Sequence, residues 1–554
     1  ESGQYYVAGR EVPAVFNGMA TAADWMSGAS FIAMAGGIYL KGYPYMAFLV
    51  GWTGGYVLVA SLIAPYLRKF GCYTVPDFIG TRYGGNFVRA CAVFVLFIAS
   101  FTYVTAQINA TGTIASRALG IPFELGVWVG LISILICSML GGMRAVTWTQ
   151  VAQYIVLIVA YLVPVFWISS KVGGGVFPHL MLGDEVARLG ELEQQFGLVK
   201  NSAADMKAAG VQGGLKYISG SHSGVPEGGM AVWKYLSLAI CMMVGTASLP
   251  HILMRYFTTP TVRAARKSVA WSLFFIFLLY SSAPMLATLS KLSLMDPNLP
   301  TGIIGKSIAD VQSLEWVQRW SEVKQVFIAD FNNDGILQLN EWFMRGDVVV
   351  LATPEVAGLP FVISGLVFAG GMAAAMSTAD GLVLAISNAL SHDIYYKIID
   401  PKADTAKRLL VARVLLVLIG AAGAYIASFR LTSILGSVAW AFDFAMSGLF
   451  FPLVLGVWWK RATRQGAIAG IITGISSGLF YLLWVYPKFS NAIWGVTNTP
   501  ILGIDHLRFG LIGAPICLIV MVVVSLMTKE PSPATQKMVD DTRIPTGKPI
   551  LGKQ

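Results

Sequence analysis

GMAAAMSTAD, residues 371–380, places two adjacent hydroxyls, Ser377 and Thr378, and the carboxylate of Asp380 inside an apolar run over residues 359–390. A run of this length can cross the hydrocarbon core of a membrane, which takes about 20 mostly apolar residues. Polar groups at that depth are costly, and they usually mark a functional site. The stretch therefore predicts a membrane helix with a binding site near its middle.

The whole chain has the composition of a membrane protein. Of its 554 residues, 56% are hydrophobic and 12% are charged, and the mean hydropathy is +0.66. Soluble domains are about 25% charged. Apolar windows recur along nearly the whole chain and predict about twelve spans: 13–40, 45–66, 88–117, 122–143, 147–170, 231–254, 266–290, 359–391, 407–428, 431–457, 464–486 and 508–528.

The net charge of +10 follows the membrane topology rather than a nucleic-acid surface. Basic residues gather at alternate connections, as the positive-inside rule requires, so no nucleic-acid partner is expected. The N-terminal segment 1–12 and the tail 529–554 are then cytoplasmic, in a bacterial-type inner (plasma) membrane. The chain opens with Glu1 rather than Met, which leaves open what precedes it. The basic residues assigned to inner loops are Arg68, Lys69, Arg82, Arg89, Arg144, Arg255, Arg263, Arg266, Lys267, Lys397, Lys407, Arg408, Lys460, Arg461 and Arg464.

Two long connections, 171–230 and 292–358, interrupt the pattern of short loops, and both are expected on the outer side. They separate a first five-span block, 13–170, from a second, which comprises 231–291 and 359–457. Because five is odd, the two blocks have opposite orientation, as in inverted-repeat transporters. The spans within 464–528 are peripheral additions. Five cysteines lie in spans or an inner loop, and no disulfide is expected.

The first span of each block is interrupted. NGMATAADWMSGASF, residues 17–31, carries Asp24, Ser27 and Gly28, and VGTASLPH, residues 244–251, carries Pro250, which disfavours helical geometry in the residue before it. One interpretation is that small residues simply permit close helix packing. The other is that both helices are broken at membrane depth, where free backbone groups hold ions and substrate.

The order of motifs resembles the sodium:solute symporter family, particularly its acetate and monocarboxylate permeases, over nearly the whole chain. The stretches that carry the resemblance are YYVAGREVPAVFNGMATAADWMSGASF (5–31), FTYVTAQINATG (101–112), GGMRAVTWTQ (141–150), GTASLPHILMRYFT (245–258) and AMSTADGLVLAISNALSHDIY (375–395). The resemblance implies an all-α polytopic membrane protein with the leucine-transporter-type 5+5 inverted repeat and about twelve transmembrane helices.

The resemblance also implies a sodium site between the first and eighth helices. Its ligands would be the backbone carbonyls of Ala23, Met26 and Ala374 and the hydroxyls of Ser377 and Thr378. Five neutral oxygens suit a monovalent ion that must also be released. The alternative is that both hydroxyls only bond back to carbonyls one turn earlier.

Two acids are candidates for the ion pathway. Asp380 is expected to form a water-exposed station toward the cytoplasm, or else to be a salt-bridge or helix-end partner. Asp24 could serve as a substrate-pathway acid, as a proton site, or as the partner of a buried base. The sequence leaves these roles open.

The substrate that the resemblance implies is a small carboxylate such as acetate, pyruvate or lactate. Half-helix N-termini would supply partial positive charge to it. For the aromatic candidates, ordinary packing or lipid contact is the alternative. The candidate substrate residues are Trp25, Ser27, Tyr103, Gln107, Thr246, Ser248 and Trp440, with Phe101 as a further aromatic.

DFNNDGILQLNE, residues 330–341, matches the calcium loop of an EF-hand, and its flanks are expected to form two supporting helices. Reduced charge at two positions indicates modest affinity. A metal-free Asx-rich turn is the alternative. Such an insertion is not expected of the acetate permeases generally. The expected ligands are Asp330, Asn332, Asp334, Ile336, Gln338 and Glu341.

These features predict a sodium-coupled secondary active symporter that imports a small monocarboxylate by alternating access. No HExxH, Walker or CxxC pattern occurs, so an enzyme is not expected. Proton coupling on the same fold is one rival. The other is a sensor or the large subunit of a complex that includes a small two-helix membrane protein. The exact substrate, the sodium stoichiometry and the oligomeric state stay undecided.

Overall fold

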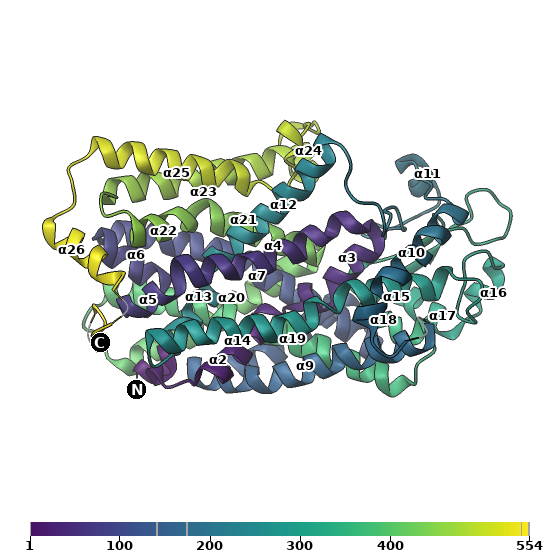
Figure 1. Cartoon of the computed structure of the whole chain (residues 1–554), viewed down its shortest axis with the longest axis horizontal. Helices are drawn as coiled ribbons and strands as arrows, with labels where there is room; N and C mark the ends of the chain where they lie inside the picture. The colour runs from purple at the N-terminus through teal and green to yellow at the C-terminus, as the bar shows by residue number, and fades with distance from the viewer. Residues whose placement is uncertain (1, 140–141, 173–174, 545, 552–554) are drawn as a thin grey trace.

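The computed structural model describes residues 2–139, 142–172, 175–544 and 546–551. It is a bundle of helices that run along one axis (Figure 1). Both chain termini lie at one end of the bundle, here called the terminal end, and the helices of the two long connections lie at the other, here called the loop end (Figure 1). The N-terminal segment contains α1 (Ser2–Val7). The first block contains α2 (Ala14–Trp25), α3 (Met34–Lys41), α4 (Met46–Leu58), α5 (Ala64–Phe70), α6 (Val75–Tyr83), α7 (Asn86–Leu119), α8 (Phe123–Met139) and α9 (Gly142–Val172).

The remainder of the chain adds a second set of long helices and one short β-hairpin. Its elements are α10 (Pro178–Phe196), α11 (Ala203–Ala208), α12 (Gly229–Ser248), α13 (Pro250–Leu253), α14 (Val262–Tyr280), α15 (Ala283–Met295), α16 (Ile308–Gln312), α17 (Glu315–Glu322), β1 (Val326–Ile328), β2 (Trp342–Met344), α18 (Val349–Val356), α19 (Phe361–Asn388), α20 (Thr405–Ser428), α21 (Ile434–Ala445), α22 (Phe451–Trp458), α23 (Arg464–Val485), α24 (Pro487–Trp494), α25 (Gly510–Met527) and α26 (Pro533–Thr542).

Within the described residues, ten helical segments are long and apolar enough to cross a membrane, and each overlaps a predicted span. The other two predicted spans do not appear among these ten segments, each for its own reason. The span predicted over 13–40 is divided into α2 and a second segment, Ala29–Lys41. The span predicted over 122–143 contains α8, but residues 140–141 lie outside the described residues.

The interruptions expected in the first span of each block are present. Helix α2 ends at Trp25, and the amide of Ser27 bonds the Trp25 carbonyl at 2.8 Å instead of continuing the α-helical pattern. Helix α12 ends at Ser248, and Leu249 is extended (φ −72°, ψ 118°) ahead of Pro250. Helix α19 packs against α2, α7 and α9, so its middle faces the first break.

The expected helices on either side of residues 330–341 are wrong where they adjoin the loop. Strands β1 and β2 flank it as an antiparallel pair, with Phe327 opposite Phe343. Aromatic and β-branched residues favour a strand over a helix here. The hairpin also joins the two long connections, because Lys216 and Met344 exchange backbone hydrogen bonds of 3.1 and 2.9 Å. We call the joined connections the cap.

Candidate ion and substrate site

Two hydroxyls in the middle of α19 reach the broken end of α2. The Ser377 hydroxyl donates to the Ala23 carbonyl at 2.6 Å, and the Thr378 hydroxyl donates to the Asp24 carbonyl at 2.7 Å. Both side chains are fully buried. The break supplies these acceptors, because a carbonyl near a helix end lacks its usual amide partner.

The alternative was that both hydroxyls bond only to carbonyls of their own helix. Among the described residues the structure shows one such bond, and it is the longer of the two that Ser377 makes. Ser377 also donates to Ala374 one turn earlier, but at the longer distance of 3.0 Å. Thr378 donates to the other helix. The predicted ligands Ala23, Ala374, Ser377 and Thr378 are thus brought together, and Met26 follows directly at the break. The Asp24 carbonyl is an additional oxygen that the sequence did not indicate.

Asp24 is the partner of a buried base. The Nε of Arg255, which follows α13, donates to its carboxylate at 2.9 Å, and both side chains are completely excluded from solvent. Arg255 also donates to Thr147 at 3.1 Å and to Gln150 on α9. Gly381 permits this approach, since a Cβ there would lie 2.2 Å from Asp24 Oδ1. Sequence reasoning missed Arg255 as a site residue, although its place in GTASLPHILMRYFT and the need of Asp24 for a base both pointed to it.

Asp380 does not have the exposed position that was expected of it. Its side chain is fully buried, and its Oδ1 accepts a hydrogen bond of 2.6 Å from Ser138 on α8. The prediction placed it on a water-filled path because it lies two residues beyond the hydroxyl pair. The neighbouring helices α8 and α9 cover that face of α19 instead.

Buried aromatic side chains pack together beside the break, and we call this cluster of residues the chamber. Trp25 lies against Phe442 of α21 with ring centroids 5.6 Å apart, and Tyr103 of α7 lies 5.8 Å from the same ring. Tyr103 also meets His251 of α13 edge-on at 5.4 Å. Both broken helices therefore contribute to one chamber, together with α7 and α21. Gln107 extends the α7 side, where its Oε1 accepts from the Gly28 amide at 2.8 Å.

Several polar atoms around this chamber have no hydrogen-bond partner among the described residues. They include the Nε2 of Gln107, the hydroxyl of Tyr56, which packs on Trp25, and both ring nitrogens of His251. Buried polar groups are nearly always paired, so such a cluster indicates an unseen water or ligand. Ser27 is buried at the same break and accepts from the Ser30 amide at 3.4 Å.

Three predicted substrate residues, Trp440, Thr246 and Ser248, make their hydrogen bonds with groups outside the chamber. Trp440 donates to His506 at 3.1 Å and packs on Tyr486 and Phe489, on the side of the last two spans, so Phe442 takes the position expected of it. The hydroxyls of Thr246 and Ser248 donate to carbonyls of their own helix at 2.6 and 2.8 Å. Residue type alone could not show which face of α12 or α21 meets the chamber.

The loop 330–341 is closed by its own hydrogen bonds. The Glu341 carboxylate is buried and accepts from the amides of Phe331 and Gln338 at 2.7 and 3.0 Å. Asp330 accepts from Gly335, whose φ of +72° makes the turn, and its second oxygen has no partner in the described structure. The described residues gather one trio of potential metal ligands within 4.8 Å, and it lies elsewhere.

That trio is Asp77, His392 and Asp393 at the terminal end. Arg89 already lies between its carboxylates, 2.8 Å from Asp77 and 2.7 Å from Asp393. The guanidinium supplies the positive charge that a metal ion would bring. The cluster therefore links α6, α7 and the end of the α19 segment as a buried ion-pair network.

A family model described as the sodium:solute symporter family matches residues 5–291 and 349–474. The matched residues include both breaks and the middle of α19, whereas the loop 330–341 lies between them. An uncharacterized symporter of Cupriavidus necator is 40% identical, and the alignment covers 98% of this chain and 90% of that protein. A monocarboxylic acid transporter of Corynebacterium glutamicum is 26% identical over 94% of this chain and 85% of its own length.

Among solved structures, a Na⁺-coupled sialic acid symporter in a substrate-bound outward-open state superposes with a TM-score of 0.64 at 15% identity. The match covers 96% of this chain and 93% of that one. The two proteins share a fold. The all-α inverted-repeat architecture predicted from the sequence is thereby confirmed.

Proposed function

Because the chain belongs to the sodium:solute symporter family and is a multi-pass membrane protein, we propose that it couples sodium entry to the import of a small monocarboxylate by alternating access. In this proposal sodium and the carboxylate are both cargo. The protein performs no covalent chemistry, and the work comes from differences in ion affinity between conformations.

One observation carries the sodium part of the proposal: Ser377 and Thr378 already point at the carbonyls of the broken α2. In our proposal the two hydroxyls turn their protons away and the helices separate slightly, so that a sodium ion binds among these oxygens, with Met26 and Ala374 completing the shell. Such an ion would join α2 to α19 across the two blocks. Its binding would thus favour the conformation in which these helices are close.

The substrate part rests on the chamber and on one relative. The unpartnered Nε2 of Gln107 and one ring N–H of His251 can each donate a hydrogen bond to a carboxylate, and the rings of Trp25 and Phe442 fit a small apolar group. The relative named as a monocarboxylic acid transporter supports acetate, pyruvate or lactate as the substrate class. Ser27 and Tyr103 complete our proposed substrate residues.

We place the loop end outside a bacterial plasma membrane and the terminal end in the cytoplasm. The basic residues at the alternate connections support this orientation. With it, the connections 171–230 and 292–358 face the exterior, and segments 1–12 and 529–554 face the cytoplasm. The blocks 13–170 and 231–457, without the connection 292–358, form the transport core, and 464–528 lie beside it.

The sodium assignment is tested by sodium-dependent uptake of labelled pyruvate into proteoliposomes. The double variant S377A/T378A should raise the sodium concentration for half-maximal uptake at least tenfold, since it removes two of the five proposed ligands. Ser364→Ala, which alters a hydroxyl on the same helix away from the break, is the matched control. An unchanged sodium dependence in the double variant would reject the site.

Proton coupling is the second candidate, and one observation favours it. Asp380 is a buried acid whose Oδ2 has no partner within the described part of the chain. Uptake driven by a pH gradient in sodium-free buffer, lost in D380N, would establish this mechanism over sodium coupling. Uptake that needs sodium at every pH would exclude it.

We further propose that residues 330–341 bind calcium weakly. The register of all six ligand positions supports this, as does the unpartnered carboxylate oxygen of Asp330. We also retain the proposal of a small two-helix partner subunit. Its test is native purification, where a stoichiometric small membrane protein is expected and its absence would remove the proposal.

A further inference from the structure

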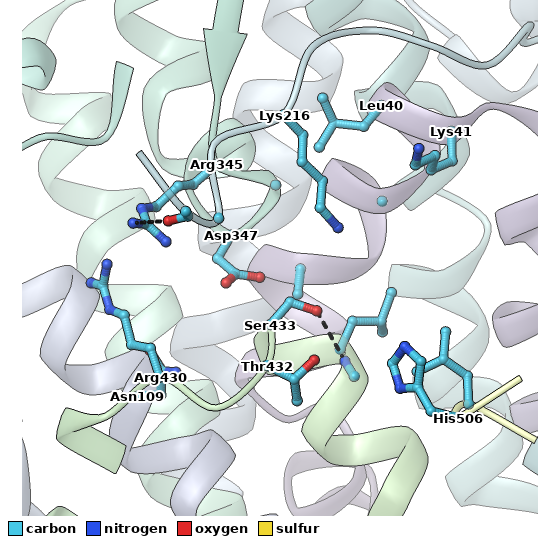
Figure 2. Close-up of a pocket in the computed structure, with 18 of the residues that line it drawn as sticks. Leu40, Lys41, Asn109, Lys216, Arg345, Asp347, Arg430, Thr432, Ser433 and His506 are labelled. Carbon is cyan, nitrogen blue, oxygen red and sulfur yellow. Dashed lines mark hydrogen bonds between the residues drawn. The ribbon is translucent and has the colours of Figure 1, made fainter. Parts of the chain in front are cut away.

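A cavity of about 540 Å³ opens at the loop end, away from the chamber. Its walls come from the cap, from α3, from the last turns of α7 and from the start of α21 (Figure 2). This volume is within the usual range for a small-molecule site. We call it the vestibule.

The vestibule is strongly cationic. Its lining contains five lysine and arginine side chains and a single carboxylate, Asp347. In Figure 2 the amine of Lys216 points into the space, and the guanidinium groups of Arg345 and Arg430 lie on the same side of Asp347. Low-dielectric walls concentrate the field of such a cluster and raise the local concentration of anions. The five basic residues are Lys41, Lys216, Arg345, Arg430 and Lys488.

These charges are incompletely neutralised within the described structure. The Nε and one terminal nitrogen of Arg430 are buried and have no hydrogen-bond partner, and so is the Nε of Arg345. Burial and the neighbouring Arg345 lower the pKa of Arg430 to about 10, which leaves it charged at neutral pH. A guanidinium matches the geometry of a carboxylate, so a wall that contains both Arg345 and Arg430 suits an organic anion.

Two of the helices that line the vestibule also carry chamber residues. Asn109 and Thr113 line it from α7, two and six residues beyond Gln107, which lies at the chamber together with Tyr103. Gly436 lines it from α21, which also carries Phe442. The same helices therefore border both spaces. The vestibule lies on the loop-end side of the proposed substrate site.

We infer that the vestibule is a second, outer binding site, at which a small organic carboxylate docks on Lys216, Arg345 and Arg430 before it enters the chamber. That the ligand is the transported carboxylate rests on the proposed function, whereas the preference for a carboxylate anion rests on the vestibule alone. Docking at this site raises the capture rate at low substrate concentration.

The first test measures the vestibule without transport. The variant T432C places a cysteine in the lining of the vestibule. In the purified protein, the rate at which this cysteine reacts with an anionic methanethiosulfonate reagent is compared with its rate with a cationic one. The wild-type protein, which lacks this cysteine, gives the background rate. The anionic reagent should react at least about tenfold faster. Adding K216Q should reduce that ratio, and millimolar pyruvate should slow the anionic reagent. Equal rates, or no slowing by pyruvate, would overturn the inference.

The second test measures sodium-driven pyruvate uptake. K216Q and K216E should raise the KM, by about three-fold and about ten-fold respectively, with less than a twofold change in maximal rate. K306Q, at an exposed lysine of the cap outside the vestibule, is the matched control and should not change the KM. A KM unchanged in K216E would overturn the docking role. Wild-type protein that fails to transport pyruvate but passes the labelling test would contradict the proposed function and leave the vestibule standing.

Discussion

Arg255 and Asp24 come from opposite five-span blocks and form an ion pair from which solvent is fully excluded, with 2.9 Å between Nε and Oδ2. Thr378 reaches the backbone carbonyl of Asp24 itself, and Ser377 reaches that of the preceding residue, Ala23. The position of the ion pair ties the second broken helix to the first. Removing either charge should therefore change the geometry of the proposed sodium site.

Removal of one charge from this pair should be more damaging than removal of both. D24L or R255M leaves an unpaired buried charge, and each should cost roughly 3 to 5 kcal/mol of stability. The double variant D24L/R255M should unfold at a higher temperature than either single variant. Melting curves in detergent measure this, and additive losses in the double variant would contradict the structural coupling. Sodium-dependent uptake by the double variant would then assign Asp24 a pairing role rather than an ion-pathway role.

His251 should bind the substrate through its ring nitrogens, which have no partner in the described structure. H251F keeps the edge-on contact with Tyr103 but removes both nitrogens, so pyruvate affinity should fall roughly tenfold or more, as expected for a lost hydrogen bond to a charged group. The measurement is concentration-dependent uptake at saturating sodium. W440F is the control, because Trp440 lies outside the chamber, and its KM should stay within twofold of wild type.

Much of the architecture could be predicted from hydropathy, because a membrane span is a long local signal. The breaks near Trp25 and Pro250 were also visible, since polar and helix-breaking residues at membrane depth are rare. The exposure of Asp380 and the surroundings of Trp440 could not be predicted. They depend on which helix covers each face, and that is decided by packing among segments far apart in sequence. The strands beside residues 330–341 were missed because the spacing of calcium ligands within the loop does not determine the secondary structure on either side of it.

Calcium should stabilise the cap. With a dissociation constant of about 1 mM, in the range of extracellular modules, 10 mM calcium would add about 1.4 kcal/mol. The unfolding temperature should therefore rise with calcium and return on chelation. E341Q should abolish the shift, whereas E322Q, at an exposed glutamate of α17 outside the loop, should retain it. Identical shifts in both variants would show that calcium acts elsewhere.

Acid should weaken the contact between Trp440 and His506. Burial is the main cause that lowers the pKa of His506, from 6.5 to about 4. In that interval the unfolded chain binds a proton that the folded chain does not, so stability falls as the pH is lowered from about 6.5 toward 4. The Nδ1 that accepts from Trp440 must also be unprotonated. The loss of melting temperature between pH 7 and pH 5 should be smaller in H506Q than in wild type, and an equal loss would refute the assignment.

The backbone pairing of Lys216 with Met344 has a consequence for grafting this transporter's exterior onto a relative. If residues 292–358 alone were transferred, their hairpin would lack the segment around Lys216 that pairs with one of its edges. Arg345 would then line the vestibule of the relative without Lys216 beside it. The two connections form one exchangeable part. A hybrid that inherits only one of them should fold its helices yet lose the surface that first meets the solute.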